Sequence, residues 1–289
     1  MSLVAVLLVS CGTTKTVPIT GRKQNLMVSD GEMLSLSTQQ YTEYMQTAKA
    51  STNATNTAMV KRVGQRLATA VETYLKNNGM AEDVQNYQWQ FNLVQDKNVN
   101  AWCMPGGLIV VYEGLLPVTQ DEPSLAIVMG HEIAHAVARH SAEQYSTQLK
   151  QQYGLQAGSV LASVLGAGSN TISAGQAIIS QGLSLQNLHY SRNHESEADH
   201  LGIIFAAMAG YDPQVAVSFW QRMAAQSSNT TSEFLSSHPS DATRIKQIQG
   251  WLPEALQYYK PQTTTSASSG KTSKTVKTTK TINISSKKK

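Results

Sequence analysis

The chain has 289 residues, of which 41% are hydrophobic, and a formal net charge of +4 at pH 7. This apolar content suffices for one sizeable folded domain. Residues 261–289 hold seven lysines and no acidic residue, so the rest of the chain carries 4 − 7 = −3. The basic balance belongs to the end of the chain and indicates no nucleic-acid groove, so no nucleic-acid partner is expected.

Both ends differ from the middle of the chain. Residues 1–10 form an apolar run too short to cross a membrane, and Cys11 follows at once. The four residues that end at Cys11 resemble a bacterial lipobox. They predict a lipoprotein signal peptide over 1–10, lipidation of Cys11 and a lipid-anchored linker over 11–25. No Lys or Arg precedes the apolar run, which leaves open a truncated start or a cytoplasmic protein with a chance apolar N-terminus. Residues 257–289, rich in Lys, Thr and Ser, are predicted to be a disordered tail.

Hydrophobic spacing between these ends predicts one mostly helical domain over residues 26–256. Apolar residues recur at helical intervals over 30–50 and 56–77. Alternation over 87–94 and a β-branched run over 108–112 predict two strands. The expected fold class is therefore α+β and predominantly helical, with a small sheet.

Residues 131–135 spell HExxH inside a segment with helical spacing. Positions i and i+4 of a helix lie about 40° apart, so His131 and His135 face the same side one turn apart. This geometry can place two imidazole nitrogens on one Zn²⁺ and leave Glu132 beside the open position of the metal.

The start of this helix is marked by Asp121, a good N-cap, followed by a proline that the first turn tolerates. Gly130 lowers helix propensity just before the first histidine. We therefore expect another part of the chain to approach the backbone closely at this glycine.

A third zinc ligand is expected further along the chain, in a segment with ExxxD spacing. His140 falls about 140° round a continuous helix from the second histidine and is not favoured. Glu195 can complete a two-His, one-Glu shell that leaves the fourth position to water. Asp199, one turn later, can accept the ring N–H of a ligand histidine, most readily His131. Glu197 points away from this face and is interpreted as a solvated residue.

With HEIAH followed by a separated ExxxD, the chain resembles the gluzincin zinc metallopeptidases, the family of HtpX and the CAAX prenyl proteases. It is most similar to their periplasmic BepA- and LoiP-like lipoprotein branch. The resemblance covers roughly residues 16–256 and includes VPITGRKQ at 17–24, NAWCMPGG at 100–107 and an HPxxxxRI segment at 238–245. One departure is a histidine at position 200, where many relatives have arginine.

The resemblance implies a zincin-like fold and one Zn²⁺ per chain, held by His131, His135 and Glu195. It implies that Glu132 takes the proton of the attacking water and passes it to the leaving amine. In the family, the residue that matches His238 faces the metal. It either stabilises the oxyanion or binds zinc as a fourth ligand that keeps the enzyme latent, and the sequence does not decide between these roles.

The family also implies that the strand over 108–112 lies at the sheet edge above the zinc, where an extended substrate could add as a strand. An ordinary core hairpin is an equal alternative. Arg244 is interpreted either as positioning the loop or the substrate, or as part of a surface ion pair. Cys103 is expected to be a buried thiol without catalytic role. The remaining histidines are predicted to be exposed and without role: His140, His189, His194 and His200.

The connection between the ligand motifs, residues 142–190, is rich in small residues and has no apolar stretch of spanning length. We interpret it as a pair of helices that flank or cover the cleft, with a membrane-dipping hairpin as the alternative.

These features predict a zinc metalloendopeptidase of the bacterial cell envelope, and the resemblance implies that it hydrolyses misfolded or unassembled envelope proteins. Its expected location is the periplasm, anchored by the N-terminal lipid, and Gly12 after the cysteine implies the outer membrane. The alternative is a zinc-bound chaperone or scaffold for outer-membrane protein assembly with little or latent proteolysis. The substrate, cleavage preference and oligomeric state are not encoded in any recognisable motif.

Overall fold

A computed structural model describes residues 12–163, 184–186, 188–227, 234, 236, 238 and 242–261; for 152–163 and 226–227 it describes the backbone alone. The predicted signal peptide with Cys11, most of the predicted tail and the middle of the 142–190 connection lie outside the described residues. The described part is a predominantly helical α+β fold with two small sheets, as expected.

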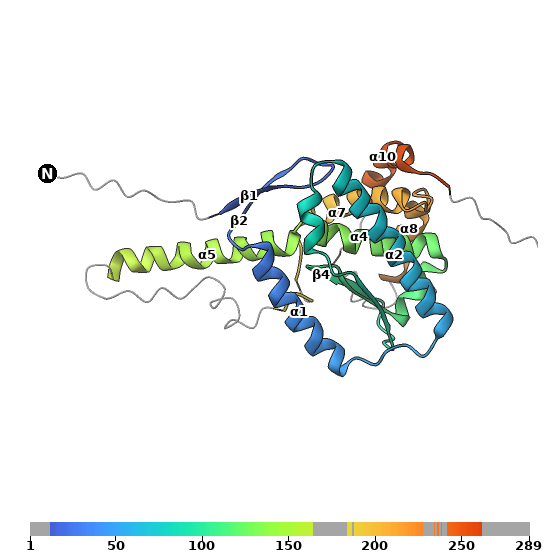
Figure 1. Cartoon of the computed structure of the whole chain (residues 1–289), viewed down its shortest axis with the longest axis horizontal. Helices are drawn as coiled ribbons and strands as arrows, with labels where there is room; N and C mark the ends of the chain where they lie inside the picture. Colours follow the sequence, from blue (N-terminus) through green and yellow to red (C-terminus); the bar gives the residue numbers. More distant parts are fainter. Residues whose placement is uncertain are drawn as a thin grey trace, which may run out of the picture.

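Helices form most of the described chain, and the two amphipathic segments near its start are among them (Figure 1). The first helix has a capping box between Ser29 and Glu32, and the second is capped by the Asn53 side chain. In chain order the α-helices are α1 (Asp30–Thr47), α2 (Ala54–Asn77), α3 (Leu116–Thr119), α4 (Glu122–Val137), α5 (His140–Ser163), α7 (Arg192–Met208), α8 (Val215–Ser227) and α10 (Ala242–Tyr258).

Two short 3₁₀ turns, η1 (Ala81–Asn86) and η2 (Glu113–Leu115), flank a three-stranded sheet. Its strands are β3 (Gln90–Val94), β4 (Ala101–Met104) and β5 (Leu108–Tyr112), in the order β3-β5-β4. β5 pairs parallel with β3 and antiparallel with β4. The implied edge position of residues 108–112 is therefore wrong: β5 is the central strand because both of its sides are paired, and β3 and β4 are the outer strands.

The central strand separates two apolar clusters, since alternate side chains of a strand point to opposite faces. Ile109 and Val111 belong to the larger cluster, which includes residues of α2, α4, α7, α8 and α10. Leu108 and Val110 belong to the smaller cluster, with residues of α1 and the start of α5. α4 lies inside the larger cluster, and every residue from Ser124 to Val137 is buried.

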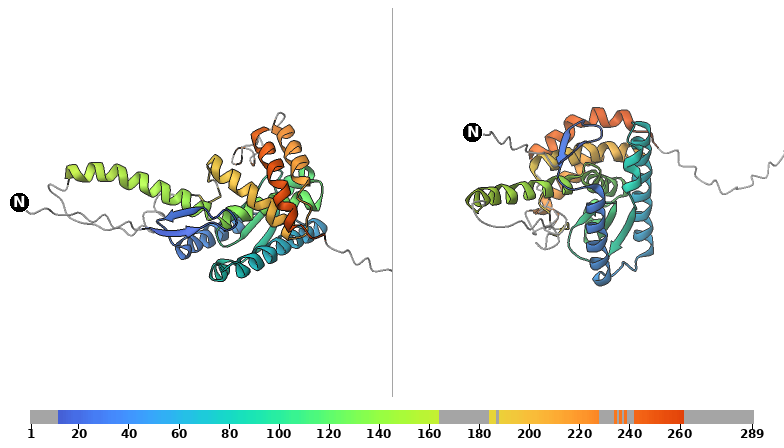
Figure 2. Two further views of the ribbon diagram at one scale, coloured as in Figure 1. Left: turned by 90° about the horizontal axis from the view of Figure 1, so that it is seen from above. Right: turned by 60° about the vertical axis from the view of Figure 1, so that its left-hand side comes forward.

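An N-terminal hairpin occupies part of the range that was predicted to be a linker. Its strands β1 (Thr13–Thr16) and β2 (Lys23–Leu26) pair antiparallel, and the turn between them inserts Val17 into the larger core cluster. The hairpin lies along α5, which projects from the body of the molecule in all three ribbon views (Figures 1 and 2). Residues 13–26 are thus an ordered part of the fold.

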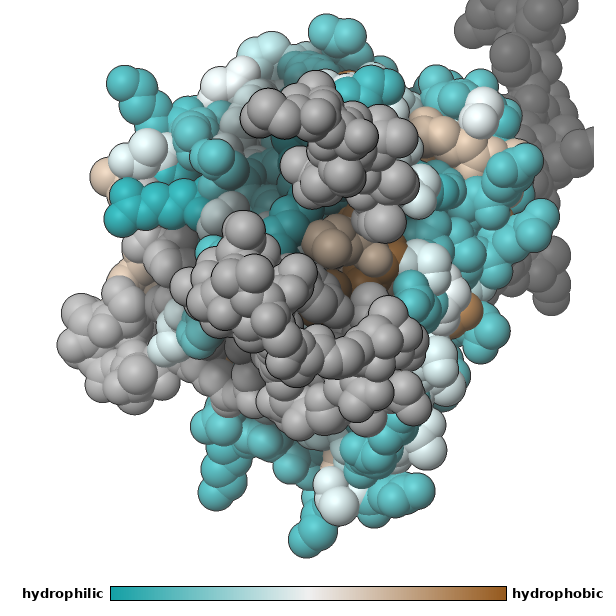
Figure 3. All heavy atoms as spheres, turned by 90° about the vertical axis from the view of Figure 1, so that its left-hand side faces the viewer, coloured by the Kyte–Doolittle hydropathy of each residue, from teal (hydrophilic) through white to brown (hydrophobic). Residues whose placement is uncertain are grey.

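The surface of the described residues is mostly polar. Leu256 is the exposed large hydrophobic residue among them. On the face that Figure 3 presents, hydrophilic residues dominate, and the hydrophobic ones lie mainly in a recess near its centre. None of the helices in the described ranges combines the length and apolarity that a membrane span requires.

The helices α4 and α7 approach each other closely where they cross. A Cβ added to Gly130 would lie 2.7 Å from the carbonyl oxygen of Gly202, and one added to Gly202 would lie 2.7 Å from the backbone nitrogen of His131. The expected close approach at Gly130 is therefore confirmed. Since both glycines lack a side chain, the two helix backbones touch directly beside the HExxH segment.

We predict that Gly202→Ala destabilises the fold by about 1–3 kcal/mol, because the added methyl group must push α7 away from α4. Gly250→Ala is the matched control: it also replaces a helical glycine, but a Cβ there meets no atom within 4 Å. Urea unfolding should show a lowered midpoint for the first variant and an unchanged or raised midpoint for the second. Equal midpoints would contradict direct backbone contact at the crossing.

Candidate metal centre

Four buried side chains converge where α4 meets the start of α7. The Nε2 atoms of His131 and His135 lie 3.0 Å apart. The two carboxylate oxygens of Glu195 face one nitrogen each: Oε2 lies 3.4 Å from His131 Nε2, and Oε1 lies 3.4 Å from His135 Nε2. His238 adds its Nδ1, which lies 3.2 Å from His131 Nε2 and 2.9 Å from the nearer carboxylate oxygen of Glu195. The structure thus brings together the three predicted ligands and the loop histidine.

These side chains fit a zinc ion. Their four ligand atoms lie within 4.8 Å of one another. Zinc bonds of about 2.0–2.2 Å in tetrahedral geometry place neighbouring ligand atoms about 3.3–3.6 Å apart, close to the separations above. Imidazole nitrogens and a carboxylate are also donors that zinc prefers. Burial alone would raise the pKa of the Glu195 carboxyl, but His238, His131 and His135 hold that pKa below its ordinary value.

Glu132 lies next to this group and is 2% exposed. Its Oε1 atom is buried and has no hydrogen-bond partner among the described residues; Nε2 of His238 lies 3.6 Å from it. Burial raises the pKa of the Glu132 carboxyl. A buried carboxylate oxygen without a partner, beside four metal donors, is suited to accept a proton from a water molecule in the cleft.

His131 is held from behind by a carboxylate. Its Nδ1 lies 2.9 Å from Oδ1 of Asp199, the arrangement that the sequence predicted. Arg244 donates to the same carboxylate at 2.6 and 2.7 Å, and its guanidinium lies 3.5 Å from the centre of the Trp220 ring. Burial alone would raise the pKa of Asp199, but Arg244 and His131 hold it below its ordinary value. Asp199 therefore stays ionised as an acceptor for the ring N–H of His131.

Arg244 is buried, so the surface ion pair that was its alternative interpretation is wrong. Besides Asp199, its Nη1 donates to the backbone carbonyl of His238 at 3.1 Å. One guanidinium therefore ties the loop histidine to the α7 carboxylate that supports His131. This connection matches the expected role of Arg244 in positioning the loop.

His140 was expected to be exposed and is instead fully buried, with Nδ1 2.9 Å from Nδ1 of His135. The reason is a break in the helix. α4 ends at Val137, Arg139 adopts a positive φ of 54°, and α5 starts at His140. The change of direction cancels the angle of about 140° that a continuous helix would impose. Burial lowers the pKa of His140 to about 4, so this imidazole is neutral.

Glu197 was interpreted as a solvated residue, and this is wrong as well, because its carboxylate is buried under the hairpin. It accepts hydrogen bonds from His140 Nε2 at 2.9 Å and from the guanidinium of Arg22 at 2.7 Å. His194 is also buried, since its ring stacks on that of His140 with 4.5 Å between centroids. His189 is exposed as expected, whereas His200 is partly covered by Trp251 and pairs with Glu254.

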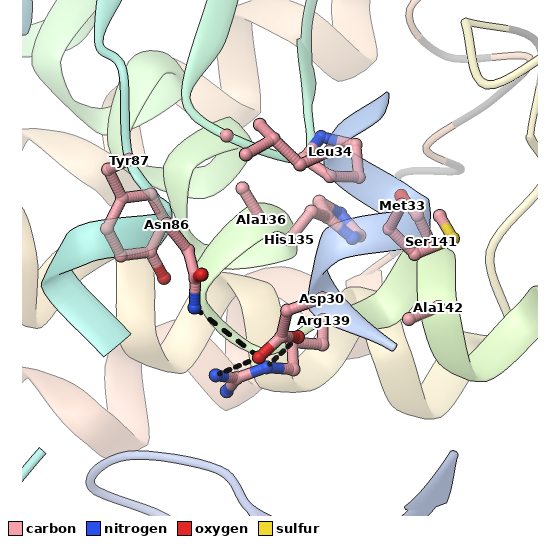
Figure 4. A pocket seen from close by; sticks show the side chains of 12 residues that line it. Asp30, Met33, Leu34, Asn86, Tyr87, His135, Ala136, Arg139, Ser141 and Ala142 are labelled. Atoms are coloured by element: carbon pink, nitrogen blue, oxygen red, sulfur yellow. Dashed lines mark hydrogen bonds and ion pairs between the residues drawn. The ribbon is translucent and has the colours of Figure 1, made fainter. Parts of the chain in front are cut away.

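A cluster of ion pairs around Arg139 fixes the backbone break between α4 and α5. Arg139 donates to Asp30 at 2.8 Å and to Asp83 at 2.7 Å. Figure 4 shows Asp30 between Arg139 and Asn86, beside a cavity of about 30 Å³ that His135 also lines. These contacts join the start of α1 and η1 to the α4–α5 turn, and so hold the backbone conformation that brings His140 to His135.

A cleft of about 230 Å³ opens beside the candidate metal centre. Trp102 and Cys103 of β4 line it together with Glu132 and His238. Tyr190 also lines it, and its ring stacks on that of His135 with 4.1 Å between centroids. Burial raises the pKa of the Cys103 thiol, so this residue is the buried thiol that the sequence predicted.

A model of the family described as "Peptidase family M48" matches residues 54–252, which include both helices of the metal centre. The chain belongs to peptidase family M48. This membership agrees with the expectation of a zinc metallopeptidase, and the four buried donors fit zinc as its metal.

Three relatives illustrate the range of similar proteins. "Mitochondrial metalloendopeptidase OMA1" of Schizosaccharomyces pombe is 35% identical over 190 residues, 64% of this chain and 53% of the relative. "Metalloendopeptidase OMA1, mitochondrial" of Bos taurus is 30% identical over 248 residues, 83% of this chain and 46% of the relative. "Putative beta-barrel assembly-enhancing protease" of Vibrio cholerae is 34% identical over 188 residues, 63% of this chain and 37% of the relative. The chain spans about half or less of the length of these curated relatives.

These relatives overturn the predicted location and cellular role. The matches that cover most of the chain are mitochondrial proteins by name, so the prediction of a periplasmic, outer-membrane lipoprotein that degrades envelope proteins is wrong. The alternative of a scaffold for outer-membrane assembly falls with it. The prediction depended on four residues around Cys11 and on a resemblance to one branch. The HExxH and ExxxD motifs describe the chemistry of the metal centre and carry no information about location.

We predict that removal of zinc by a chelator lowers the melting temperature by about 10 °C, because zinc at about a thousand times its Kd stabilises the folded state by about 4 kcal/mol. Differential scanning calorimetry of the zinc-loaded and chelated protein measures this shift. Glu195→Gln, which weakens the donor set, should melt at nearly the same temperature with and without zinc. An unchanged melting temperature for the wild type would contradict a metal-binding role for the four side chains.

Proposed function

We propose that this chain is a zinc-dependent endopeptidase of zincin-like architecture that cleaves internal peptide bonds of protein substrates. His131, His135 and Glu195 hold the metal. The observation that carries the proposal is the position of Glu132: its carboxylate oxygen has no hydrogen-bond partner among the described residues, lies beside a group of four zinc donors, and belongs to a residue that lines a cleft. Membership of family M48 supports the same reaction class.

When bound, zinc lowers the pKa of a water molecule and polarises the scissile carbonyl group. Glu132 then accepts the proton of the attacking water and delivers it to the nitrogen of the leaving amine. Burial raises the pKa of the Glu132 carboxyl, so this carboxylate takes the proton of the water more readily than an exposed one would. Asp199 keeps His131 in the tautomer whose Nε2 faces the metal.

The substrate backbone is proposed to lie along β4. This strand is paired on one side by β5, and its residues Ala101 to Cys103 line the cleft next to Glu132. An extended peptide can add to such an edge through main-chain hydrogen bonds, which do not depend on the peptide sequence. A segment of an unfolded or misassembled protein supplies this conformation more easily than a folded one does.

His238 is proposed to be the fourth zinc ligand in the described conformation. Its Nδ1 faces both Glu195 oxygens and His131 Nε2, whereas its Nε2 points toward Glu132. Three imidazoles and a carboxylate fill a tetrahedral shell, so a water molecule can occupy a metal position only when His238 withdraws. The conformation described is then a latent one.

We predict that Glu132→Gln lowers the turnover of unfolded casein by about 10²–10⁴-fold or more while zinc remains bound, since the amide cannot accept the proton. Turnover and zinc content should be measured on the same preparation. Glu43→Gln, an identical change on the outer face of α1, serves as control and should match the wild type. Cleavage by Glu132→Gln at the wild-type rate would refute the proposed role.

We predict that His238→Ala weakens zinc binding and raises casein cleavage at saturating zinc, because it opens the fourth position. His200→Ala, which removes a histidine from the surface between α7 and α10, should change neither property. A His238→Ala variant with unchanged zinc affinity and lowered kcat would show instead that this histidine stabilises the oxyanion.

A further inference from the structure

His131 and His135 are supported from behind in different ways. The ring nitrogen of His131 that faces away from the candidate metal meets a carboxylate, Asp199. The corresponding nitrogen of His135 meets another imidazole, Nδ1 of His140, at 2.9 Å. Beyond it, Nε2 of His140 lies 2.9 Å from Oε2 of Glu197. A carboxylate therefore stands behind each ligand histidine, but the one behind His135 acts through an intervening ring.

One arrangement of protons satisfies this whole line of contacts. A histidine that binds metal through Nε2 carries its proton on Nδ1, so His135 donates to His140. His140 must then accept at Nδ1 and carry its own proton on Nε2, which donates to Glu197. The chain of contacts thus fixes the tautomers of both rings, provided that Glu197 remains an ionised acceptor in a fixed position.

The N-terminal hairpin holds Glu197 in that position. Arg22 donates to it through Nε at 2.9 Å and Nη2 at 2.7 Å, and Thr20 donates at 2.7 Å. The same guanidinium donates to both carboxylate oxygens of Glu143 on α5, at 2.8 Å each. Arg22 therefore joins α5 and α7 at one point, through two bidentate contacts of the kind that fixes geometry most strongly.

The hairpin also fastens the backbone just before His140. Gln24, on β2, donates through Nε2 to the carbonyl of Ala138 at 2.7 Å and to Glu143 at 2.6 Å. This carbonyl belongs to the break between α4 and α5. The hairpin thus constrains His140 in two ways: it holds the backbone just before this residue, and it holds the carboxylate of Glu197 that the ring contacts.

We propose that His140, Glu197 and Arg22 are positioning residues for the zinc ligand His135, and that the β1–β2 hairpin is for this reason an integral part of the metal centre. The inference rests on the proposed zinc site. Loss of the line of contacts would leave the Nδ1–H of His135 buried without an acceptor and the ring free to turn. A ligand that has lost such support typically binds metal 10–100-fold more weakly.

The test is zinc affinity, measured by competition with a chromophoric chelator on the full chain. His140→Phe keeps a ring that can stack on His194 and removes both hydrogen bonds. We expect its Kd for zinc to rise about 10–100-fold. Ser146→Ala is the matched control: it removes the hydrogen bond of 2.8 Å that Ser146 accepts from the N–H of Met27, just after the hairpin, and the bond of 2.7 Å that it donates to the carbonyl of Ala142, without a contact to His135. Its Kd should stay within about twofold of the wild type, because the line of contacts behind His135 is intact.

The melting temperature of the zinc-free protein separates positioning from general stability. A purely structural role would lower this temperature in both variants and leave the zinc Kd unchanged. Arg22→Gln provides a second route if His140→Phe does not fold, since it acts on Glu197 from the surface side; its Kd should also rise several-fold. A Kd within about twofold of the wild type in each variant that folds would overturn the proposal. If zinc binds tightly but neither the wild type nor His238→Ala cleaves casein, the proposed function is refuted and this inference still stands.

Discussion

The direct contact between the backbones of α4 and α7 is the constraint on which the metal centre depends. Glycines at positions 130 and 202 allow the contact, and either Cβ would come within 2.7 Å of backbone of the other helix. With the helices this close, the ligand atoms of the two HExxH histidines, Glu195 and His238 all lie within 4.8 Å of one another. A separation larger by a methyl group would move the carboxylate beyond zinc-bonding distance, so helix packing and metal binding are one requirement.

Around this crossing, the rest of the fold supplies what two helices cannot supply alone. The α10 arginine, Arg244, fixes Asp199 behind one ligand, and the hairpin arginine, Arg22, fixes Glu197 behind the line that ends at the other. Both arginines make bidentate contacts with carboxylates on α7. Elements from opposite ends of the described chain thus converge on a single helix, which explains how so hydrophobic a core tolerates this many charged groups.

The i, i+4 spacing of HExxH and ExxxD predicted which residues could form the site, because both motifs lie within regular helices. Contacts between distant segments were not predictable in this way. His140 reaches His135 only because the helix breaks at Arg139, where φ is 54°, and no propensity rule anticipates a left-handed arginine. Glu197 is buried by Arg22, which is 175 residues away in the sequence. Strand order was not predictable either: the β-branched run identified residues 108–112 as a strand but did not show that it is the central one.

X-ray absorption at the zinc edge tests the central claim most directly, because it reports the ligands of the metal in the purified protein. We expect one zinc per chain with four nitrogen or oxygen neighbours at about 2.0–2.2 Å and the outer-shell scattering of imidazole rings. In the His131→Ala variant, the imidazole scattering should fall. A sulfur neighbour at about 2.3 Å, or a shell of light atoms without imidazole scattering, would contradict the assignment of His131, His135, Glu195 and His238 as the metal centre.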